Sequence, residues 1–469
     1  MIHKFKAKDL NIVLDVNSGG VHLVDDLTYD LLDHLEEPLA EECPEEAVKA
    51  LADKYTREQV EECYGEILEL YHDKVLFSGD PYAVYAETAI NSPIKAMCLH
   101  ISHDCNLRCK YCFASTGDFG TGRKLMPLET AKAAIDFLLE KSVGRENLEL
   151  DFFGGEPLMN FDVVKQTVAY ARSKEKEYGK HFRFTITTNG MLLDDDAIDF
   201  INKEMSNVVL SLDGRREVND RMRSSRNGKG SYDLIVPKFK ELADLRNQEN
   251  YYIRGTYTHY NTDFANDILH IADLGFKEIS LEPVVAPPDA DYALRESDLP
   301  VLLDQYDKLA VEMLRREKKG NGFTFFHYMI DLTGGPCIVK RVSGCGVGTE
   351  YVAVSPEGDL YPCHQFVGEE NFKLGNVFTG IDNNAVRDQF RQCNIYAHKE
   401  CDDCFARFYC SGGCVANAYH STGSINGVYE FGCELHRRRI EIAIMLKVAQ
   451  FEAEQAELRM EDRYQILVD

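Results

Sequence analysis

The chain has 469 residues, of which 44% are hydrophobic, enough for two or three domains around a sizeable buried core. Its formal net charge of −26 argues against nucleic acid as a partner, because phosphate binding needs a basic surface; a solvated acidic surface is the simplest interpretation, and capture of a basic peptide is the alternative. No stretch approaches the roughly 20 apolar residues of a membrane span, and the first residues lack the apolar core of a secretory signal, so we expect no membrane partner and a cytoplasmic location.

Residues 1–80 have the pattern of a small separate domain. The turn Asn17-Ser18-Gly19-Gly20 is a hairpin signal between short apolar strands, and amphipathic segments follow it. The expected strands and helices are 2–5, 11–15, 20–24, 27–37, 44–54 and 56–72. Three strands followed by three helices suggest a winged-helix-like module, and the segment 81–93 is the expected linker.

From 94 to about 325, short apolar strands alternate with amphipathic helices. The expected strands are 96–101, 148–153, 182–187, 208–212, 252–257 and 278–281, and the expected helices are 128–141, 163–178, 195–204, 232–245, 263–274 and 299–316. Six strand–helix units predict an α/β fold with a parallel sheet wrapped by helices, as in a partial (β/α)6 barrel. In such folds the chemistry collects at the carboxyl ends of the strands.

Fifteen cysteines are many for a reducing cytosol, where disulfides are rare, and their tight spacings favour metal or cluster binding. Cys105, Cys109 and Cys112 form a CX3CX2C loop directly after the first barrel strand. Three thiolates can hold three irons of a cubane and leave the fourth iron open to a ligand. The alternative is a zinc loop, for which His103 is the only obvious fourth ligand nearby.

With the strand before it, this spacing resembles the radical S-adenosylmethionine (SAM) superfamily. The resemblance implies that the open iron binds the amino and carboxylate groups of SAM, and that Tyr111 packs on the adenine. Gly154, Gly155 and Glu156 end the second strand in a Gly-Gly-Glu-Pro motif. The two glycines let backbone carbonyls approach a ligand, and in the superfamily this segment binds the methionyl ammonium.

Two further motifs end strands three and four, Thr187-Thr188-Asn189-Gly190 and Ser211-Leu212-Asp213-Gly214. Either could be a plain turn. In the resembled superfamily the fourth-strand serine and a following basic residue contact the ribose and the carboxylate of SAM, and the matching positions here are Ser211 and Arg223. The sixth strand, at 280–284, could add backbone contacts to the adenine.

The C-terminal third carries a second cysteine pattern, CX12GX4C followed by CX2CX5CX3C and one more cysteine. It resembles the SPASM domain, which holds two auxiliary [4Fe–4S] clusters. A zinc ribbon would stop at four cysteines, and a disulfide framework would need an oxidising compartment. The implied ligands are Cys345, Cys363 and Cys414 for the first auxiliary cluster, and Cys401, Cys404, Cys410 and Cys433 for the second. Cys337 either completes the first cluster or leaves there an open iron able to bind a substrate thiolate.

The order of these parts, together with Asn11-Ile-Val-Leu-Asp-Val-Asn-Ser-Gly19 and Leu360-Tyr-Pro-Cys363-His-Gln-Phe366, closely resembles the thioether-forming maturases of SCIFF peptides, which belong with the sactipeptide and ranthipeptide synthases. The implied parts are a PqqD-like leader-peptide recognition element (1–80), a linker (81–93), the radical SAM barrel (94–325), the SPASM domain (330–440) and a C-terminal helix (441–469).

This resemblance implies three [4Fe–4S] clusters, SAM, a cysteine-rich precursor peptide bound through its leader, and an external flavodoxin- or ferredoxin-type electron donor. A radical derived from SAM abstracts hydrogen from an acceptor residue, and a substrate cysteine thiolate attacks the resulting carbon radical to form a thioether. Two alternatives stay open: an anaerobic sulfatase maturase, which would share every cluster motif, and a peptide-binding electron carrier with no catalysis.

Overall fold

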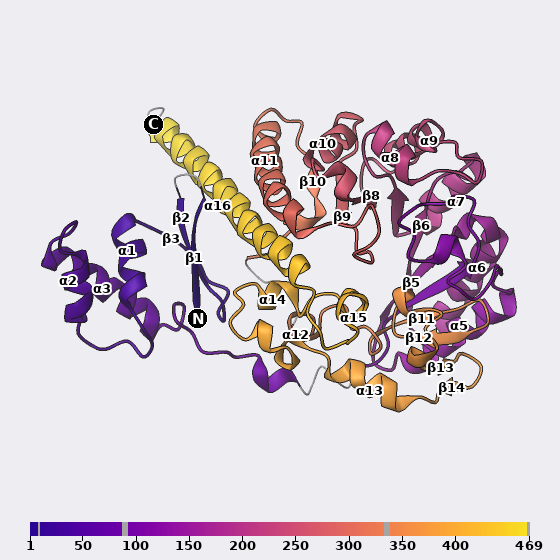
Figure 1. Cartoon of the computed structure of the whole chain (residues 1–469), viewed down its shortest axis with the longest axis horizontal. Coiled ribbons are helices and arrows are strands. Elements are labelled where there is room, and N and C mark those ends of the chain that lie inside the picture. The colour runs from indigo at the N-terminus through magenta and orange to yellow at the C-terminus, as the bar shows by residue number, and fades with distance from the viewer. Residues whose placement is uncertain (8–9, 87–91, 333–337, 467–469) are drawn as a thin grey trace.

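The computed structural model of the protein describes residues 1–7, 10–86, 92–332 and 338–466. A small N-terminal module, a large α/β body and a loop-rich region joined to one long helix follow one another along the chain (Figure 1). No helix in these described ranges is both long enough and apolar enough to cross a membrane.

The N-terminal module is a three-stranded antiparallel sheet followed by three helices. Its elements are β1 (Ile2–Ala7), β2 (Leu10–Asp15), β3 (Val21–Val24), α1 (Asp26–Leu31), α2 (Glu45–Leu51) and α3 (Arg57–His72). Asp25 caps α1, and Thr56 with Gln59 forms a capping box at the start of α3. The expected elements are all present, but the helix expected to reach residue 37 ends at Leu31 and continues only as a 3-10 turn.

Both faces of the module's sheet are buried. Val13 of β2 packs with the three helices, whereas Ile12 and Leu14, which point to the opposite face, join the hydrophobic core of the main body. All three side chains are fully inaccessible to solvent. Because burial of the second face requires the rest of the chain, the module is attached to the body rather than tethered beside it.

The body is the expected α/β unit. Its strands are β4 (Ala96–Ser102), β5 (Asn147–Gly154), β6 (His181–Thr188), β7 (Asn207–Ser211), β8 (Tyr251–Tyr257), β9 (Glu278–Pro283) and β10 (Thr324–Phe325). Its helices are α5 (Leu128–Lys141), α6 (Phe161–Tyr178), α7 (Asp195–Glu204), α8 (Arg216–Met222), α9 (Tyr232–Leu245), α10 (Ala265–Asp273) and α11 (Leu299–Glu317). All seven strands run parallel in the order β4 to β10, so their carboxyl ends meet at one rim.

The sheet continues beyond β4 into the cysteine-rich region. β11 (Tyr351–Val354) pairs with β4 in parallel, and antiparallel β12 (Asp359–Tyr361), β13 (Gly375–Asn376) and β14 (Gly380–Ile381) follow outward. The buried carboxylate of Glu350, just before β11, forms ion pairs with Lys95 and Arg145 of the body. One sheet therefore spans two of the regions separated by the sequence pattern.

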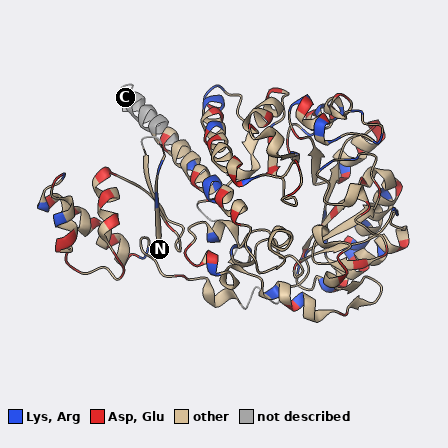
Figure 2. Cartoon of the chain, viewed as in Figure 1, with Lys and Arg blue, Asp and Glu red and all other residues tan. Residues whose placement is uncertain are grey.

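The remaining elements are α12 (Ile338–Ser343), α13 (Asn384–Gln392), α14 (Arg407–Cys410), α15 (Val415–Thr422) and α16 (Glu430–Ile466). Helix α16 leaves the loop-rich region and runs past the strands of the N-terminal module (Figure 1). The Arg438 side chain ties it to Asp307 of α11 at 2.5 Å. Acidic side chains are numerous on the module's helices α1–α3 (Figure 2).

Candidate functional site

The first candidate site is the loop between β4 and α5, which brings together Cys105, Cys109 and Cys112. Backbone amides of the loop donate to the carbonyl of Ser224 at 2.7 Å and to that of Met222, the last residue of α8, at 2.9 Å. Burial raises the pKa of the Cys105 thiol to about 12 and that of Cys109 to about 11. Such thiols keep their protons at neutral pH, so ligation of a metal or cluster by this loop would have to release those protons.

Two N–H groups point at the sulfur of Cys105. The Leu107 amide lies 3.4 Å from Sγ, and the Asn189 side-chain amide, at the end of β6, lies 3.5 Å from it. Asn189 also donates to Asn106 Oδ1 at 2.8 Å. Donors directed at a sulfur favour its thiolate form.

Three glycines pack directly against this loop. A Cβ at Gly154 would lie 2.3 Å from the carbonyl oxygen that ends β4, and one at Gly155 would lie 2.2 Å from a carbonyl of the cysteine loop. A Cβ at Gly117, whose φ is 99°, would lie 2.7 Å from that of Cys105. Only glycine permits the carboxyl end of β5 to approach the cysteines this closely.

Glu156 is fully buried and joins two strand ends. Its carboxylate accepts hydrogen bonds from the Thr188 hydroxyl (2.8 Å), the Asn189 amide (2.8 Å) and the Leu158 amide (3.0 Å). Three donors within the chain thus occupy this carboxylate. In this arrangement Glu156 fixes the ends of β5 and β6 to each other.

Tyr111 is held between two charged residues. Its hydroxyl donates to the fully buried Asp213 carboxylate at 2.7 and 2.8 Å and accepts a hydrogen bond from Arg223 Nη1 at 2.8 Å. Arg223 Nε is buried and has no partner within the described residues. A guanidinium with an unused donor suits an anionic ligand such as a carboxylate. Ser211 ends the neighbouring strand β7.

His103 does not face the three cysteines. Its Nδ1 lies 2.8 Å from Thr121 Oγ1 and its Nε2 lies 3.1 Å from His100 Nδ1, and burial lowers its pKa to about 4. Throughout the described ranges, no three His, Cys, Asp or Glu side chains are close enough to hold a single metal ion. The zinc-loop hypothesis thus lacks its fourth ligand, whereas the irons of a cubane separate the thiolates that hold them.

The first auxiliary set lies at the ends of short elements. Cys345 precedes β11, Cys363 follows β12 and Cys414 precedes α15. The thiol of Cys363 lies within electrostatic reach of the other two, and its burial raises its pKa well above the usual range. Cys337, the fourth ligand considered from the sequence, lies outside the described residues.

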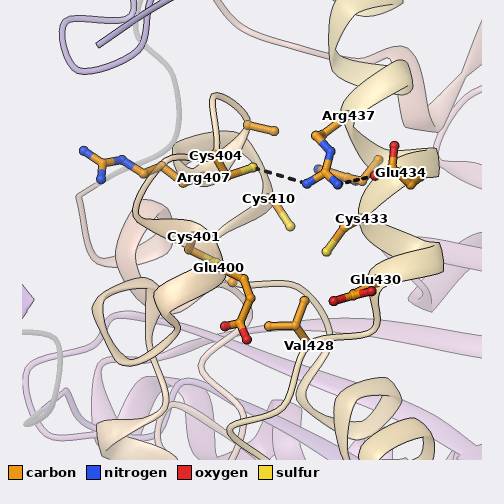
Figure 3. A pocket seen from close by; sticks show the side chains of 13 residues that line it. Glu400, Cys401, Cys404, Arg407, Cys410, Val428, Glu430, Cys433, Glu434 and Arg437 are labelled. Atoms are coloured by element: carbon orange, nitrogen blue, oxygen red, sulfur yellow. Dashed lines mark hydrogen bonds and ion pairs between the residues drawn. The ribbon is translucent and has the colours of Figure 1, made fainter.

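The second auxiliary set lines a cavity of about 300 Å³ (Figure 3). Cys401 and Cys404 lie in the segment before α14, Cys410 is the last residue of α14, and Cys433 comes from the first turn of α16. The guanidinium Nη1 of Arg437, one turn further along α16, lies 4.0 Å from Cys404 Sγ. The structure therefore brings together four cysteines that span 33 residues of the sequence.

Four residues near these sites were not singled out from the sequence. Asn189 and Asp213 belong to strand-end motifs that the sequence could not distinguish from turns, and Arg437 has no local signal. His364, directly after Cys363, is half-buried, and its ring packs 5.0 Å from that of Phe153 at the end of β5. Its position next to a cysteine of the pattern was the one signal available.

Family comparison agrees with this geometry. A model described as the radical SAM superfamily matches residues 99–275, and a model described as an iron–sulfur cluster-binding domain, SPASM, matches residues 345–405. The chain carries a radical SAM domain and a SPASM domain. Together these domains imply a SAM-binding [4Fe–4S] cluster and auxiliary clusters.

Curated relatives of this radical SAM/SPASM chain are moderately similar. It is 25% identical to a cysteine-type anaerobic sulfatase-maturating enzyme of Clostridium novyi, over 67% of this chain and 86% of that protein. It is 24% identical to the subtilosin biosynthesis protein AlbA of Bacillus subtilis, over 87% and 86%. The radical SAM cyclopropyl synthase TigE of Paramaledivibacter caminithermalis is 22% identical, over 73% and 72%.

Solved structures share the fold. The sulfatase maturase anSMEcpe with bound AdoMet superposes with a TM-score of 0.64 at 20% identity, covering 76% of this chain and 99% of that one. Streptococcus suis SuiB bound to its precursor peptide SuiA superposes with a TM-score of 0.52 at 16% identity, covering 91% and 97%. The predicted fold class, a mostly parallel α/β radical SAM domain followed by a SPASM domain, is confirmed.

The residues present fit these cofactors. The three cysteines of the first loop leave one corner of a cubane to a ligand, the free Nε of Arg223 suits a carboxylate, and the four-cysteine cavity has the donor set of a [4Fe–4S] cluster.

Proposed function

We propose that this chain forms thioether cross-links in a ribosomally made, cysteine-rich precursor peptide of the SCIFF type. The observation that carries the proposal is the N-terminal module, a small sheet-and-helix unit packed against the SPASM region. An enzyme that recognises only a short motif at its reaction site has no need of such a module, whereas one that follows a leader peptide does.

The leader is proposed to bind along β3. Within the described residues β3 pairs with β2 alone, so its other edge presents backbone N–H and C=O groups. A peptide can add a strand to such an edge, gaining affinity from main-chain hydrogen bonds. The acidic side chains of α1–α3 would favour a leader that carries lysine or arginine.

The proposed roles of the body follow from its contacts. When bound, the first cluster and SAM supply reductive cleavage of SAM and a carbon-centred radical that takes a hydrogen atom. Cys105, Cys109 and Cys112 hold this cluster, and the Tyr111–Asp213 hydrogen bond fixes an aromatic ring beside it. Gly154 and Gly155 lie beside the methionyl end of SAM. Arg223 and Ser211 contact the carboxylate of SAM.

The auxiliary cysteines supply the proposed exit for the surplus electron. Cys345, Cys363 and Cys414 hold the first auxiliary cluster. Cys401, Cys404, Cys410 and Cys433 hold the second, beside Arg437. A thiolate held at the first auxiliary cluster would be in its nucleophilic form, as thioether formation requires.

A sulfatase-type activity is the second candidate, since relatives with that name share the same domains. The matches to AlbA and SuiB cover 87% and 91% of this chain, however, against 67% and 76% for the sulfatase maturases of Clostridium novyi and anSMEcpe. This difference favours a peptide maturase. A pure electron carrier would gain nothing from the ligand-accepting site beside Arg223.

The test is anaerobic turnover of the reconstituted full chain with SAM and a synthetic cysteine-rich precursor peptide. Thioether formation removes two hydrogen atoms per cross-link and protects one cysteine per cross-link from alkylation. The same peptide without its leader is the control and should react poorly. An aldehyde-reactive product that has lost sulfur would instead identify a formylglycine-forming enzyme.

A second experiment tests the site assignment. Three cubanes predict roughly 12 irons per chain. A combined Cys105→Ala, Cys109→Ala and Cys112→Ala variant should keep about 8 irons and form no 5′-deoxyadenosine. Continued cleavage of SAM by this variant would contradict the assignment.

A further inference from the structure

The segment that carries three cysteines of the second auxiliary set also carries side chains that reach the N-terminal module. In Figure 3 the thiols of Cys404, Cys410 and Cys433 point into the cavity, whereas Arg407, which contributes to the cavity lining, extends its guanidinium to the opposite side. Arg407 Nη2 donates to Asn17 Oδ1 at 2.7 Å and to Asp80 Oδ2 at 3.1 Å. Both partners belong to the N-terminal part of the chain.

These partners are themselves fixed. Asn17, in the turn between β2 and β3, is buried and donates to the Ser78 carbonyl at 2.7 Å. Asp80 also accepts a hydrogen bond from the Tyr396 hydroxyl at 3.1 Å. The Arg407 side chain is only 10% exposed, and its bond to Asn17 is partly buried, whereas its bond to Asp80 is open to solvent. One guanidinium therefore joins the β2–β3 turn and the end of the module to the cysteine loop.

Two aromatic residues of the same loop also contact the N-terminal part of the chain. Phe405, directly after Cys404, stacks on His3 of β1 with ring centroids 3.5 Å apart and planes inclined by 3°. Phe408 meets Tyr82 of the linker edge-on at 4.7 Å. All three contacts come from the six-residue stretch that begins at Cys404 and precedes Cys410.

This stretch has little regular structure beyond one helical turn. Its second half belongs to α14 (Arg407–Cys410), its first half is turn and irregular chain, and neither Cys404 nor Cys410 forms a disulfide within the described residues. A loop of this kind takes its shape from ligation, because metal or cluster binding supplies the folding free energy that a small irregular core lacks.

We propose that assembly of the second auxiliary cluster anchors the N-terminal module, and that Arg407 is the positioning residue of this anchor. Ligation at Cys404 and Cys410 fixes the loop, and the loop in turn holds Phe405, Arg407 and Phe408 against the module. The position of the bound leader relative to the barrel then depends on this cluster. The link to catalysis rests on the proposed peptide-maturase function; the anchoring itself does not.

Helix α16 reinforces the same connection. His3 Nε2 lies 3.0 Å from Glu441 Oε1, two turns after Cys433, and Arg438 holds Glu441 at 2.7 Å. Because Cys433 is the fourth thiol of the cavity, both elements that supply thiols, the cysteine loop and α16, contact the module. Loss of the cluster would therefore release both contacts together.

The primary test is hydrogen–deuterium exchange of the anaerobically reconstituted full chain, with iron counted in parallel. Arg407→Gln should keep about 12 irons, and Ile12 and Leu14 should still hold the module on the body. Amides of the β2–β3 turn and of residues 78–82 should nevertheless exchange faster, because they lose their fixed contact with the cysteine loop. Arg391→Gln is the matched control, an arginine of the SPASM region that pairs with Asp388; it should exchange like the parent chain. Unchanged exchange at these amides in Arg407→Gln would overturn the proposal.

Coupling is tested in the reverse direction by chelation. Since linkage is reciprocal, releasing the module must weaken retention of the cluster that anchors it. Arg407→Gln should lose about 4 irons to a chelator faster than the parent chain or Arg391→Gln. Equal rates of iron loss would refute the coupling even where hydrogen exchange has changed, and this measurement needs no cysteine variant that could fail to fold.

The catalytic consequence is measured separately, with leader peptide and full precursor. For Arg407→Gln the leader Kd should stay unchanged, since β3 is intact, while kcat for the precursor should fall by about tenfold or more through misplacement of the substrate. A weakened leader Kd with unchanged kcat would contradict the positioning role. If hydrogen exchange and chelation respond as expected and no peptide is modified, the proposed function fails and the anchor stands.

Discussion

Replacing Tyr111 by phenylalanine separates two explanations of an aromatic residue beside the first cysteine loop. If the ring acts only by packing on the adenine of SAM, phenylalanine should replace it without loss. In the structure, however, the hydroxyl donates to Asp213 at 2.7 and 2.8 Å and accepts from Arg223 at 2.8 Å. Tyr111→Phe therefore removes one hydrogen bond from each of two buried charged groups.

The size of the effect follows from these contacts. A hydrogen bond to a charged partner contributes about 1.5–3 kcal/mol. Part of the loss is recovered, because Asp213 keeps the Thr256 amide at 3.1 Å and Arg223 Nη1, now 3.9 Å away, can move toward it. A net cost of about 2 kcal/mol corresponds to about 30-fold weaker SAM binding if the misplaced ring and guanidinium both face the cofactor.

The assay is calorimetric SAM binding to the reconstituted chain, with 5′-deoxyadenosine formation as a second readout. Tyr170→Phe is the matched control: its hydroxyl also contacts both oxygens of a carboxylate, Asp136, at 2.8 and 3.1 Å, but on the outer helices. Tyr170→Phe should bind SAM normally. A Tyr111→Phe chain that retains its iron and binds SAM within twofold of the parent would refute the anchoring role of the hydroxyl.

Three further predictions concern single positions. Gly155→Ala places a Cβ 2.2 Å from a backbone oxygen and should lose about 4 irons per chain, whereas Gly65→Ala, with nothing within 4 Å of its Cβ, should lose none in the same iron assay. Burial, and then a neighbouring carboxylate, raise the pKa of Asp151 to about 7. Since an unfolded aspartate ionises near pH 4, the folded chain binds an extra proton between about pH 4 and 7, and its free energy of unfolding falls as pH rises. The melting temperature of Asp151→Asn should therefore fall less than that of the parent chain over this window. An identical slope of melting temperature against pH would be contrary to expectation. Arg437→Met removes a cation 4.0 Å from a thiol of the second auxiliary set. If this cation attracts the added electron by about 1 kcal/mol, its loss should lower the reduction potential of that cluster by roughly 30–60 mV in an anaerobic titration. Arg438→Met is the control and should leave the potential unchanged, because the Arg438 side chain points to α11.

Local pattern was enough to find most elements of the body. The helices expected at 195–204 and 232–245 coincide with α7 and α9, and the strand expected at 96–101 differs from β4 by one residue. Helical periodicity, caps such as Asp194 and apolar strand runs are all encoded within a few residues of each other. The cysteine spacing likewise located the groups that the structure brings together.

What the sequence did not predict depends on long-range contacts. The pairing of β11 with β4 and the Tyr111–Asp213 hydrogen bond join segments that are far apart in the chain. The short helices α12, α13 and α15 lie in a region without sustained periodicity, where neighbouring loops decide the conformation. The contacts of Arg407 were equally hidden, because an arginine between two cysteines gives no indication of which way it points.

The pairing of β11 with β4 also has a consequence during synthesis on the ribosome. Strand β4 leads directly into the first cysteine loop, yet its outer edge stays unpaired until β11 emerges, more than half the chain length later. An exposed edge of an apolar strand invites pairing with other chains. Expression of the chain cut before residue 345 should therefore give aggregated protein, and slower translation should increase dependence on chaperones. Insertion of the first cluster is then expected to be a late event that follows completion of the sheet.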